Sequence, residues 1–254
     1  MNPNPRQIQL LKILHGTGAC SLETLAHELG VTVQTVRRDV QRLAEAHLLV
    51  RFHGGARLPN STIENIAYQQ RAQLNAGRKE RIAQAIAREI PNDCSLIINI
   101  GTTAEAIARA LIHHTGLRVI TNNMNVAYTL GPQPGCEIIL AGGSVRSRDY
   151  GIVGEATVEF IRQFRVDVAL IGISGIEEDG TLRDYDFREI KVAQAIMQSA
   201  RAVWLAADAS KFHRPAMVRL GELADIDRLF TDAQPPAPFP DLLEAAGVDC
   251  MIAS

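Results

Sequence analysis

Residues 21–43, SLETLAHELGVTVQTVRRDVQRL, predict two short amphipathic helices joined by a tight turn. Ser21 and Thr32 each precede a helical stripe, where a hydroxyl can accept a hydrogen bond from an unpaired backbone N–H. Gly30 follows the first stripe, and glycine often ends helices because it adopts the left-handed conformation without strain. Apolar residues recur every three or four positions, as one buried helix face requires: Leu22, Leu25, Ala26 and Leu29, then Val33, Val36, Val40 and Leu43. Two capped helices around a glycine turn are the sequence form of a helix-turn-helix.

The second helix has a polar face opposite its apolar stripe. In a helix of about 3.6 residues per turn, this face and its flanks carry Gln34, Thr35, Arg37, Arg38, Gln41 and Arg42. Glutamine can pair with the major-groove edge of adenine and arginine with that of guanine, and the first turns of a reading helix lie deepest in the groove. We therefore predict base contacts by Gln34, Thr35 and Arg38. For Arg37 and Arg42 we predict phosphate contacts. The alternative is an ordinary solvated helix face.

A β-hairpin is predicted to follow these helices. Residues 48–52 are rich in β-forming side chains, and the Gly54-Gly55 pair after them favours a tight turn. The basic side chains of this hairpin, Arg51, His53 and Arg57, are predicted to contact phosphates or the minor groove. Together with a predicted helix at residues 6–15, residues 1–57 form a winged helix-turn-helix that binds double-stranded DNA.

The charge distribution agrees with a DNA-binding head. The chain of 254 residues has a net charge of −2, but residues 1–57 carry seven Lys/Arg against four Asp/Glu, a net +3. The N-terminus lacks the apolar core of a signal peptide, and no apolar run could cross a membrane. The four cysteines are far apart, as expected of free thiols in a reducing cytoplasm. We therefore expect a cytoplasmic location and no membrane partner.

Residues 58–78 are predicted to be a linker, and residues 79–254 a second domain. Strands alternate with helices in this domain, a pattern typical of a mostly parallel α/β sheet covered on both faces. The predicted strands are 95–100, 117–121, 137–140, 168–173, 202–207, 228–231 and 248–251. The predicted helices are 79–89, 104–112, 125–130, 156–162, 187–199 and 241–246.

Small polar loops follow five of the predicted strands. In parallel sheets such loops gather at the carboxyl edge, where ligands bind. Glycine, threonine and the free N–H groups at a helix start can hold a phosphate, and basic side chains can add charge. The predicted effector residues are Gly101, Thr102, Thr103, Thr121, Asn122, Asn123, Gly142, Gly143, Arg146 and Lys211. We expect no metal and no cofactor, since His113 and His114 have no acid or cysteine near them.

An enzyme is the alternative to a regulator. A sugar-phosphate isomerase-like enzyme with an attached helical domain would need a positioned acid and base. The candidates Asp149, Glu155, Asp186 and Glu189 show no spacing that singles out a pair. No catalytic residue is therefore predicted.

Several short motifs resemble the DeoR family of bacterial repressors of sugar metabolism. They are TVRRD (35–39), HGG (53–55), KE (79–80), GTT (101–103), TNN (121–123), AGG (141–143) and SK (210–211). The resemblance implies a second domain similar to ribose-5-phosphate isomerases and no catalysis. It also implies a homodimer or homotetramer on palindromic operators, released from DNA by a phosphorylated effector.

A second set of motifs resembles the members of that family that control glycerol 3-phosphate metabolism. These motifs are RSRD (146–149), GI (151–152), GEAT (154–157), IGISGI (171–176) and MV (217–218). The resemblance implies sn-glycerol 3-phosphate, or a related sugar phosphate, as the effector. The chain departs from the family at Asn99, where related repressors usually place an aspartate that would accept a hydroxyl of the effector.

Overall fold

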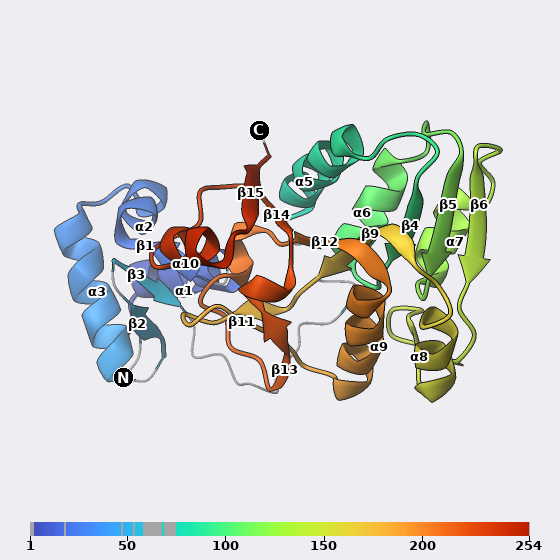
Figure 1. Ribbon diagram of the computed structural model, residues 1–254. Coiled ribbons are helices and arrows are strands. Elements are labelled where there is room, and N and C mark those ends of the chain that lie inside the picture. Colours follow the sequence, from blue (N-terminus) through green and yellow to red (C-terminus); the bar gives the residue numbers. More distant parts are fainter. Residues whose placement is uncertain are drawn as a thin grey trace.

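The computed structural model describes residues 3–17, 19–46, 48–52, 54–57, 68 and 75–253. It contains a small helical domain and a larger α/β domain that lie side by side (Figure 1). His53 and most of the predicted linker, residues 58–67 and 69–74, lie outside the described residues.

The small domain has three helices and a three-stranded antiparallel sheet. The helices are α1 (Pro5–Thr17), α2 (Leu22–Leu29) and α3 (Val33–Glu45). The strands are β1 (Ala19–Ser21), β2 (Val50–Phe52) and β3 (Gly55–Arg57), in the order β1-β3-β2. Leu10, Leu14, Leu25, Val36 and Leu43 have no exposed surface and form the core. The prediction of a helix-turn-helix with a hairpin is confirmed, whereas β1 was missed because three residues show no alternation.

The large domain contains a seven-stranded sheet whose order is β15-β14-β12-β9-β4-β5-β6. Every pair of neighbouring strands is parallel. The strands are β4 (Ser95–Ile98), β5 (Leu117–Thr121), β6 (Cys136–Leu140), β9 (Val166–Gly172), β12 (Ala200–Ala206), β14 (Arg228–Thr231) and β15 (Asp249–Ile252). All seven correspond to predicted strands: β5 and β14 have the predicted bounds, and the ends of the others differ by at most two residues.

Helices cover both faces of this sheet (Figure 1). One face packs against α5 (Ala76–Glu89), α6 (Thr102–Ala110) and α7 (Met124–Leu130). The other packs against α8 (Glu155–Ile161), α9 (Phe187–Gln198) and α10 (Phe239–Ala246). In β4, Leu96 and Ile98 point to the first face and Ile97 to the second, so both sides of the strand are buried. This two-sided burial explains why the inner strands are largely apolar, whereas the edge strands β6 and β15 keep exposed residues.

Several short elements were not predicted. A hairpin is formed by β7 (Ser144–Val145) and β8 (Ile152–Val153), and a small antiparallel sheet by β10 (Gly175–Ile176), β11 (Thr181–Asp184) and β13 (Val218–Glu222). The 3₁₀ helices are η1 (Ala209–Lys211) and η2 (Leu223–Asp225). Such short strands have no period to read, because pairing with distant segments creates them. Helix α5 also begins three residues before its predicted start.

Candidate functional site

The turn between α2 and α3 has the capping geometry that the sequence predicts. The hydroxyl of Ser21 accepts a hydrogen bond from the backbone N–H of Thr24 at 3.1 Å, and that of Thr32 accepts one from Thr35 at 3.3 Å. Gly30 is left-handed with φ 63°. A residue with a side chain would be strained there. Ser21 therefore fixes the start of α2, and Gly30 and Thr32 fix the turn between α2 and α3.

The polar face of α3 is accessible. Gln34, Arg37, Arg38 and Arg42 are exposed, and Thr35 is half-buried with its hydroxyl 3.0 Å from that of Thr32. Figure 1 shows α3 at the outer edge of the small domain, on the side away from the α/β domain. The helix is therefore free to enter a major groove, and the individual base and phosphate contacts stay predictions.

Asp39 lies on the opposite side of α3 and ties it to α1. Its carboxylate is 2% exposed, 2.6 Å from Nε of Arg6, and accepts a hydrogen bond from Nε2 of Gln7 at 3.1 Å. The hydrogen bond to Asp39 raises the pKa of Arg6. Because its charge is paired and buried, this carboxylate does not repel a phosphate backbone at the polar face.

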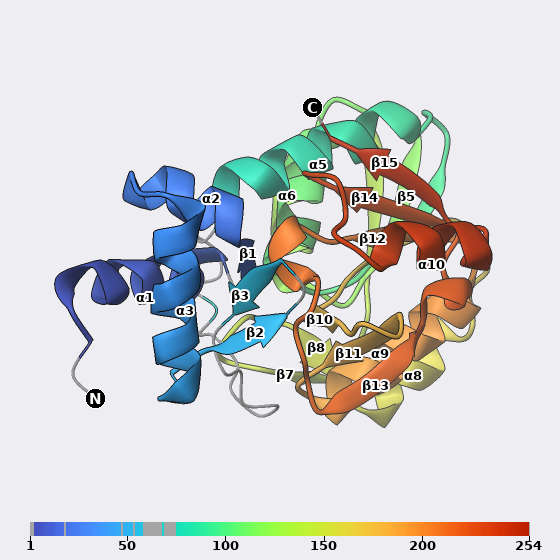
Figure 2. The ribbon, with the colours of Figure 1, turned by 90° about the vertical axis from the view of Figure 1, so that its left-hand side faces the viewer.

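The β2–β3 hairpin, called the wing below, turns towards the α/β domain (Figure 2). Arg51 is exposed on β2, as a phosphate contact requires. Arg57 is half-buried, and burial lowers its pKa while the nearby Glu177 and Glu178 raise it. A DNA contact by Arg57 would first need the wing to leave this position. His53 lies outside the described residues.

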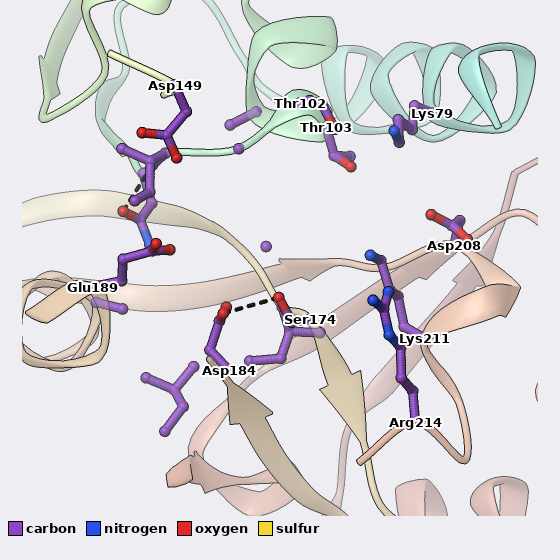
Figure 3. Close-up of a pocket in the computed structure, with 18 of the residues that line it drawn as sticks. Lys79, Thr102, Thr103, Asp149, Ser174, Asp184, Glu189, Asp208, Lys211 and Arg214 are labelled. Atoms are coloured by element: carbon purple, nitrogen blue, oxygen red, sulfur yellow. Dashed lines mark hydrogen bonds between the residues drawn. The ribbon is translucent and has the colours of Figure 1, made fainter. Parts of the chain in front are cut away.

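A polar cavity opens at the carboxyl edge of the sheet, where β4, β9 and β12 lie side by side (Figure 3). After β4 the chain adds β5 and β6 on one side, and it then returns to place β9 on the other side of β4. Ligands bind at such a switch point because the loops leave towards opposite faces. The polar lining comes from Asn75, Lys79, Asn99, Thr102, Thr103, Asp149, Ser174, Asp184, Glu189, Asp208, Ser210, Lys211 and Arg214.

One side of this cavity is suited to an anion. Lys79, Lys211 and Arg214 come from two distant segments and converge there beside Thr103 (Figure 3). Helix α6 starts at the same place, after Gly101, whose φ of 130° favours glycine and which has no side chain with which to cap the helix. Free N–H groups at a helix start bind phosphate oxygens. The cations and the helix start therefore favour a phosphate on this side.

The other side of the cavity is acidic. Asp149, Asp184 and Glu189 lie across the cavity from Lys79 in Figure 3. Ser174 donates a hydrogen bond to Asp184 at 2.9 Å, and burial, followed by the charge of Asp184, raises the pKa of Glu189. Carboxylates and hydroxyls of this kind accept hydrogen bonds from ligand hydroxyls. The cavity therefore matches a ligand with an anionic end and a hydroxylated end.

The predicted effector residues fall into two groups. Gly101, Thr102, Thr103 and Lys211 line the cavity together. The lining does not include Thr121, Asn122, Asn123, Gly142, Gly143 or Arg146. Thr121 is the last residue of β5, and the other five lie in segments after β5 and β6. Arg146 adjoins the cavity through Asp149 and Glu189, which line it.

Local contacts engage most of the polar groups of the six residues outside the cavity, but Oδ1 of Asn122 and Nδ2 of Asn123 are buried without a hydrogen bond to any described residue. Thr121 donates to the carbonyl of Ile98 at 2.6 Å, and Asn123 caps α7. The amide of Asn122 donates to Ile152, and the carbonyl of Gly142 accepts from Thr157. A side chain at position 143, where φ is 148°, would collide with Thr157. Arg146 is surrounded by the carboxylates of Asp149, Asp186 and Glu189. Their position indicates structural roles, and effector contacts by them stay untested.

The sequence reading missed Lys79 and Arg214 as cavity residues. Lys79 is 6% exposed and lies one turn before Ile82 and Ala83, on the same face of α5. A lysine that continues an apolar stripe was the available signal, because an unneeded charge is rarely placed on a buried face. Arg214 gave no signal, since its loop forms only through contacts with β10.

Neither a membrane span nor a metal site is found in the part of the chain that the structure describes. No described helix is long and apolar enough to cross a bilayer. Within the same residues, no three His, Cys, Asp or Glu side chains are placed to hold a metal ion.

A capped helix-turn-helix joined to an α/β domain with a polar cavity defines the chain as a DNA-binding regulator with a sensor domain. Comparison with known families supports both halves. The DeoR-like helix-turn-helix domain matches residues 6–62, and the DeoR C terminal sensor domain matches residues 74–233. The chain belongs to the DeoR family.

Individual relatives are similar over nearly the whole chain. The glycerol-3-phosphate regulon repressor of Escherichia coli (strain K12) is 46% identical, over 93% of each chain. That of Haemophilus influenzae is 48% identical, over 92% of this chain and 91% of its own. The HTH-type transcriptional repressor CsqR of Escherichia coli (strain K12) is 39% identical, over 98% of this chain and 95% of its own.

Among solved structures the likeness is distant. Ribose 5-phosphate isomerase A from Methanocaldococcus jannaschii has a TM-score of 0.41 at 14% identity, over 54% of this chain and 55% of its own.

Proposed function

We propose that this protein is a transcriptional repressor that binds operator DNA through α3 and leaves it when glycerol 3-phosphate, or a related sugar phosphate, enters the cavity. The convergence of Lys79, Lys211 and Arg214 at the start of α6 carries the effector half of the proposal. The exposed Gln/Thr/Arg face of α3 carries the DNA half. The names of the most similar relatives support both, since they are repressors of a glycerol 3-phosphate regulon.

The two sides of the cavity favour a polyol monophosphate over other anions. A phosphate beside the three cations would direct its carbon chain towards Asp184 and Glu189, which can accept hydrogen bonds from hydroxyls. A second phosphate on that side would meet carboxylates and be repelled. Asn99 also lines the cavity, and its Oδ1 accepts a hydrogen bond from the backbone N–H of Ile100 at 2.8 Å. Its amide nitrogen is left to act as a donor, where an aspartate would act as an acceptor.

A regulator, rather than an enzyme, is the reading that the relatives support. The alternative of an isomerase-like enzyme has carboxylates in the cavity, at Asp149 and Glu189. The three relatives compared above, which cover more than nine-tenths of the chain, are named as repressors.

We infer that the repressor acts in the cytoplasm as a homodimer or homotetramer. Palindromic operators present two half-sites, and a symmetric oligomer places one α3 in each. Residues 58–78 would join the DNA-binding domain to the sensor domain. Tyr68 supports this division, because its hydroxyl donates to Glu105 of α6 at 2.8 Å and so anchors the connection beside the cavity.

An electrophoretic mobility shift with the promoter next to the gene tests the proposal. We expect a sequence-specific complex that weakens steeply with salt, because phosphate contacts release counterions. Added sn-glycerol 3-phosphate should dissociate the complex, and glycerol with inorganic phosphate should not. A folded protein that shifts specific and random DNA equally would refute the proposal.

Replacement of Arg38 by alanine should reduce operator affinity by about 5- to 150-fold, the value of one bidentate base contact. Arg38 is exposed and has no structural role in the core, so the thermal melt should not change. Arg201→Ala is the matched control, since Arg201 is an exposed arginine of the sensor domain that faces Asp167 at 3.5 Å. Equal operator affinity of the wild type and Arg38→Ala would contradict the assigned face of α3.

A further inference from the structure

One loop borders both the cavity and the DNA-binding domain. Residues 208–214 follow β12 and contain η1. Ser210, Lys211 and Arg214 line the cavity, and Figure 3 shows the side chains of Lys211 and Arg214 extending into it. His213 lies between these two residues but faces the small domain, in a separate groove that it lines together with Phe52 of the wing. The same short loop therefore contacts both functional parts.

The contact between the loop and the wing is a stack of two rings. The rings of Phe52 and His213 are 4.6 Å apart at an interplanar angle of 22°. Phe239 of α10 meets the imidazole edge-on at 4.9 Å. Nδ1 of His213 lies 3.2 Å from Oε1 of Glu178. The imidazole is 6% exposed, so the wing rests on a ring that the sensor domain holds on its other sides.

The wing itself shapes the position of Phe52. Phe52 pairs with Gly55 across the hairpin, and a side chain at position 55 would collide with the Phe52 ring and the carbonyl of Cys20. The ring therefore lies over the hairpin, and a movement of His213 acts on the wing backbone through it.

Within the sensor domain, the loop packs closely against β10. His213 has a positive φ of 56°, which is uncommon for a residue with a side chain. The backbone of Arg214 packs directly on Gly175, where a side chain would collide with its carbonyl, and Phe212 forms a bridge with Ile176. The backbone on either side of His213 therefore packs against β10, which places Lys211, His213 and Arg214 on one short segment.

The docked contact also contains buried polar atoms that lack partners. Among the described residues, Nε2 of His213 and Nε of Arg57 are buried without a hydrogen bond. Buried donors and acceptors of this kind lower the stability of the arrangement that buries them. The wing can therefore separate from the sensor domain at a modest cost, which a switch requires.

We propose that the loop at residues 208–214 transmits effector binding to the DNA-binding domain through the stack of His213 on Phe52. A phosphate held by Lys211 and Arg214 shifts the loop, alters the fit of His213 against Phe52, and so changes how the wing and α3 are presented to DNA. This inference rests on the proposed function, because it requires a phosphate ligand and an operator. His213 and Phe52 act as positioning residues and contact neither.

The test measures operator affinity with and without sn-glycerol 3-phosphate for the wild type, Phe52→Ala and His213→Ala. In the wild type, sn-glycerol 3-phosphate should lower operator affinity by about 5- to 150-fold. In both variants it should lower operator affinity by less than about threefold. Phe52 is outside the cavity lining, so calorimetry should still detect glycerol 3-phosphate binding by Phe52→Ala, with an affinity that differs from the wild type by no more than the coupling factor of about 5- to 150-fold. Val50→Ala is the matched control, because Val50 is an exposed residue of the same strand and should show the wild-type decrease in operator affinity.

Three results would count against these ideas, and they are distinguishable. If sn-glycerol 3-phosphate lowers the operator affinity of Phe52→Ala and His213→Ala as much as it lowers that of the wild type, the role of the stack is overturned. Loss of glycerol 3-phosphate binding by Phe52→Ala would overturn it too, since the residue would then act on the cavity rather than on transmission. A wild type that binds no operator, or ignores glycerol 3-phosphate, would refute the proposed function and the coupling with it.

Discussion

Replacing Arg146 with methionine is expected to lower the free energy of unfolding by about 3–5 kcal/mol, the cost of breaking a buried ion pair from one side. The side chain of Arg146 is 8% exposed and lies among the carboxylates of Asp149, Asp186 and Glu189, which are 8%, 11% and 13% exposed. Methionine fills a similar volume but leaves these charges with only the half-exposed Arg148 as a shared cationic partner. Denaturant titration at pH 7 measures the effect.

The difference in free energy of unfolding between the wild type and Arg146→Met should become smaller as the pH falls. Burial, and then the charge of Asp184, already raises the pKa of Glu189. Without Arg146 that pKa rises further, so the folded variant binds a proton that the unfolded chain releases. A carboxyl with a raised folded pKa adds relative stability at low pH, which is lost as the pH rises through that value.

Arg118→Met is the matched control for Arg146→Met. Arg118 lies 2.7 Å from Glu137 on the surface, with both side chains more than half exposed. Such pairs contribute about 0–1 kcal/mol. An equal decrease in the free energy of unfolding of the two variants would show that Arg146 stabilises the fold no more than a surface ion pair does.

Replacing Lys211 with methionine is expected to weaken binding of sn-glycerol 3-phosphate by about 10- to 150-fold, since hydrogen bonds to charged groups contribute about 1.5–3 kcal/mol. Lys211 lies at the anionic-ligand side of the cavity, next to Arg214 and the start of α6. Operator binding without effector should remain near the wild-type value. Induction should then need a correspondingly higher effector concentration in the mobility shift.

Two further variants make the result specific. Lys191→Met removes an exposed lysine of α9 outside the cavity lining and should bind effector as the wild type does. Lys211→Arg keeps the positive charge beside Asp208, whose pKa burial tends to raise but Lys211 and Ser210 lower overall. It should retain more affinity than Lys211→Met. Unaltered affinity in Lys211→Met would exclude Lys211 as a phosphate contact.

Local patterns in the sequence determined the DNA-binding helix and the sheet. The caps at Ser21 and Thr32 and the turn at Gly30 lie where the sequence predicts them, because each depends only on neighbours within four residues. The apolar runs of the inner strands were equally readable, since burial on both faces leaves a continuous signal. The edge strands β6 and β15, which are partly exposed, were also predicted. Val33 is the one member of its predicted stripe that is only half-buried, as expected at the first turn of a helix.

Only the tertiary structure decided which loops share a cavity and how the two domains touch. The loops after β4, β5, β6, β9 and β12 look alike in the sequence, yet the fold places the residues that directly follow β4, β9 and β12 around one cavity and leaves those that directly follow β5 and β6 outside its lining. Lys79 and the stack of Phe52 on His213 likewise depend on segments far apart in the chain. The physical reason is the range of the interactions: caps and helical periods are local, whereas strand order and domain contacts arise from packing between distant residues, which no short pattern records.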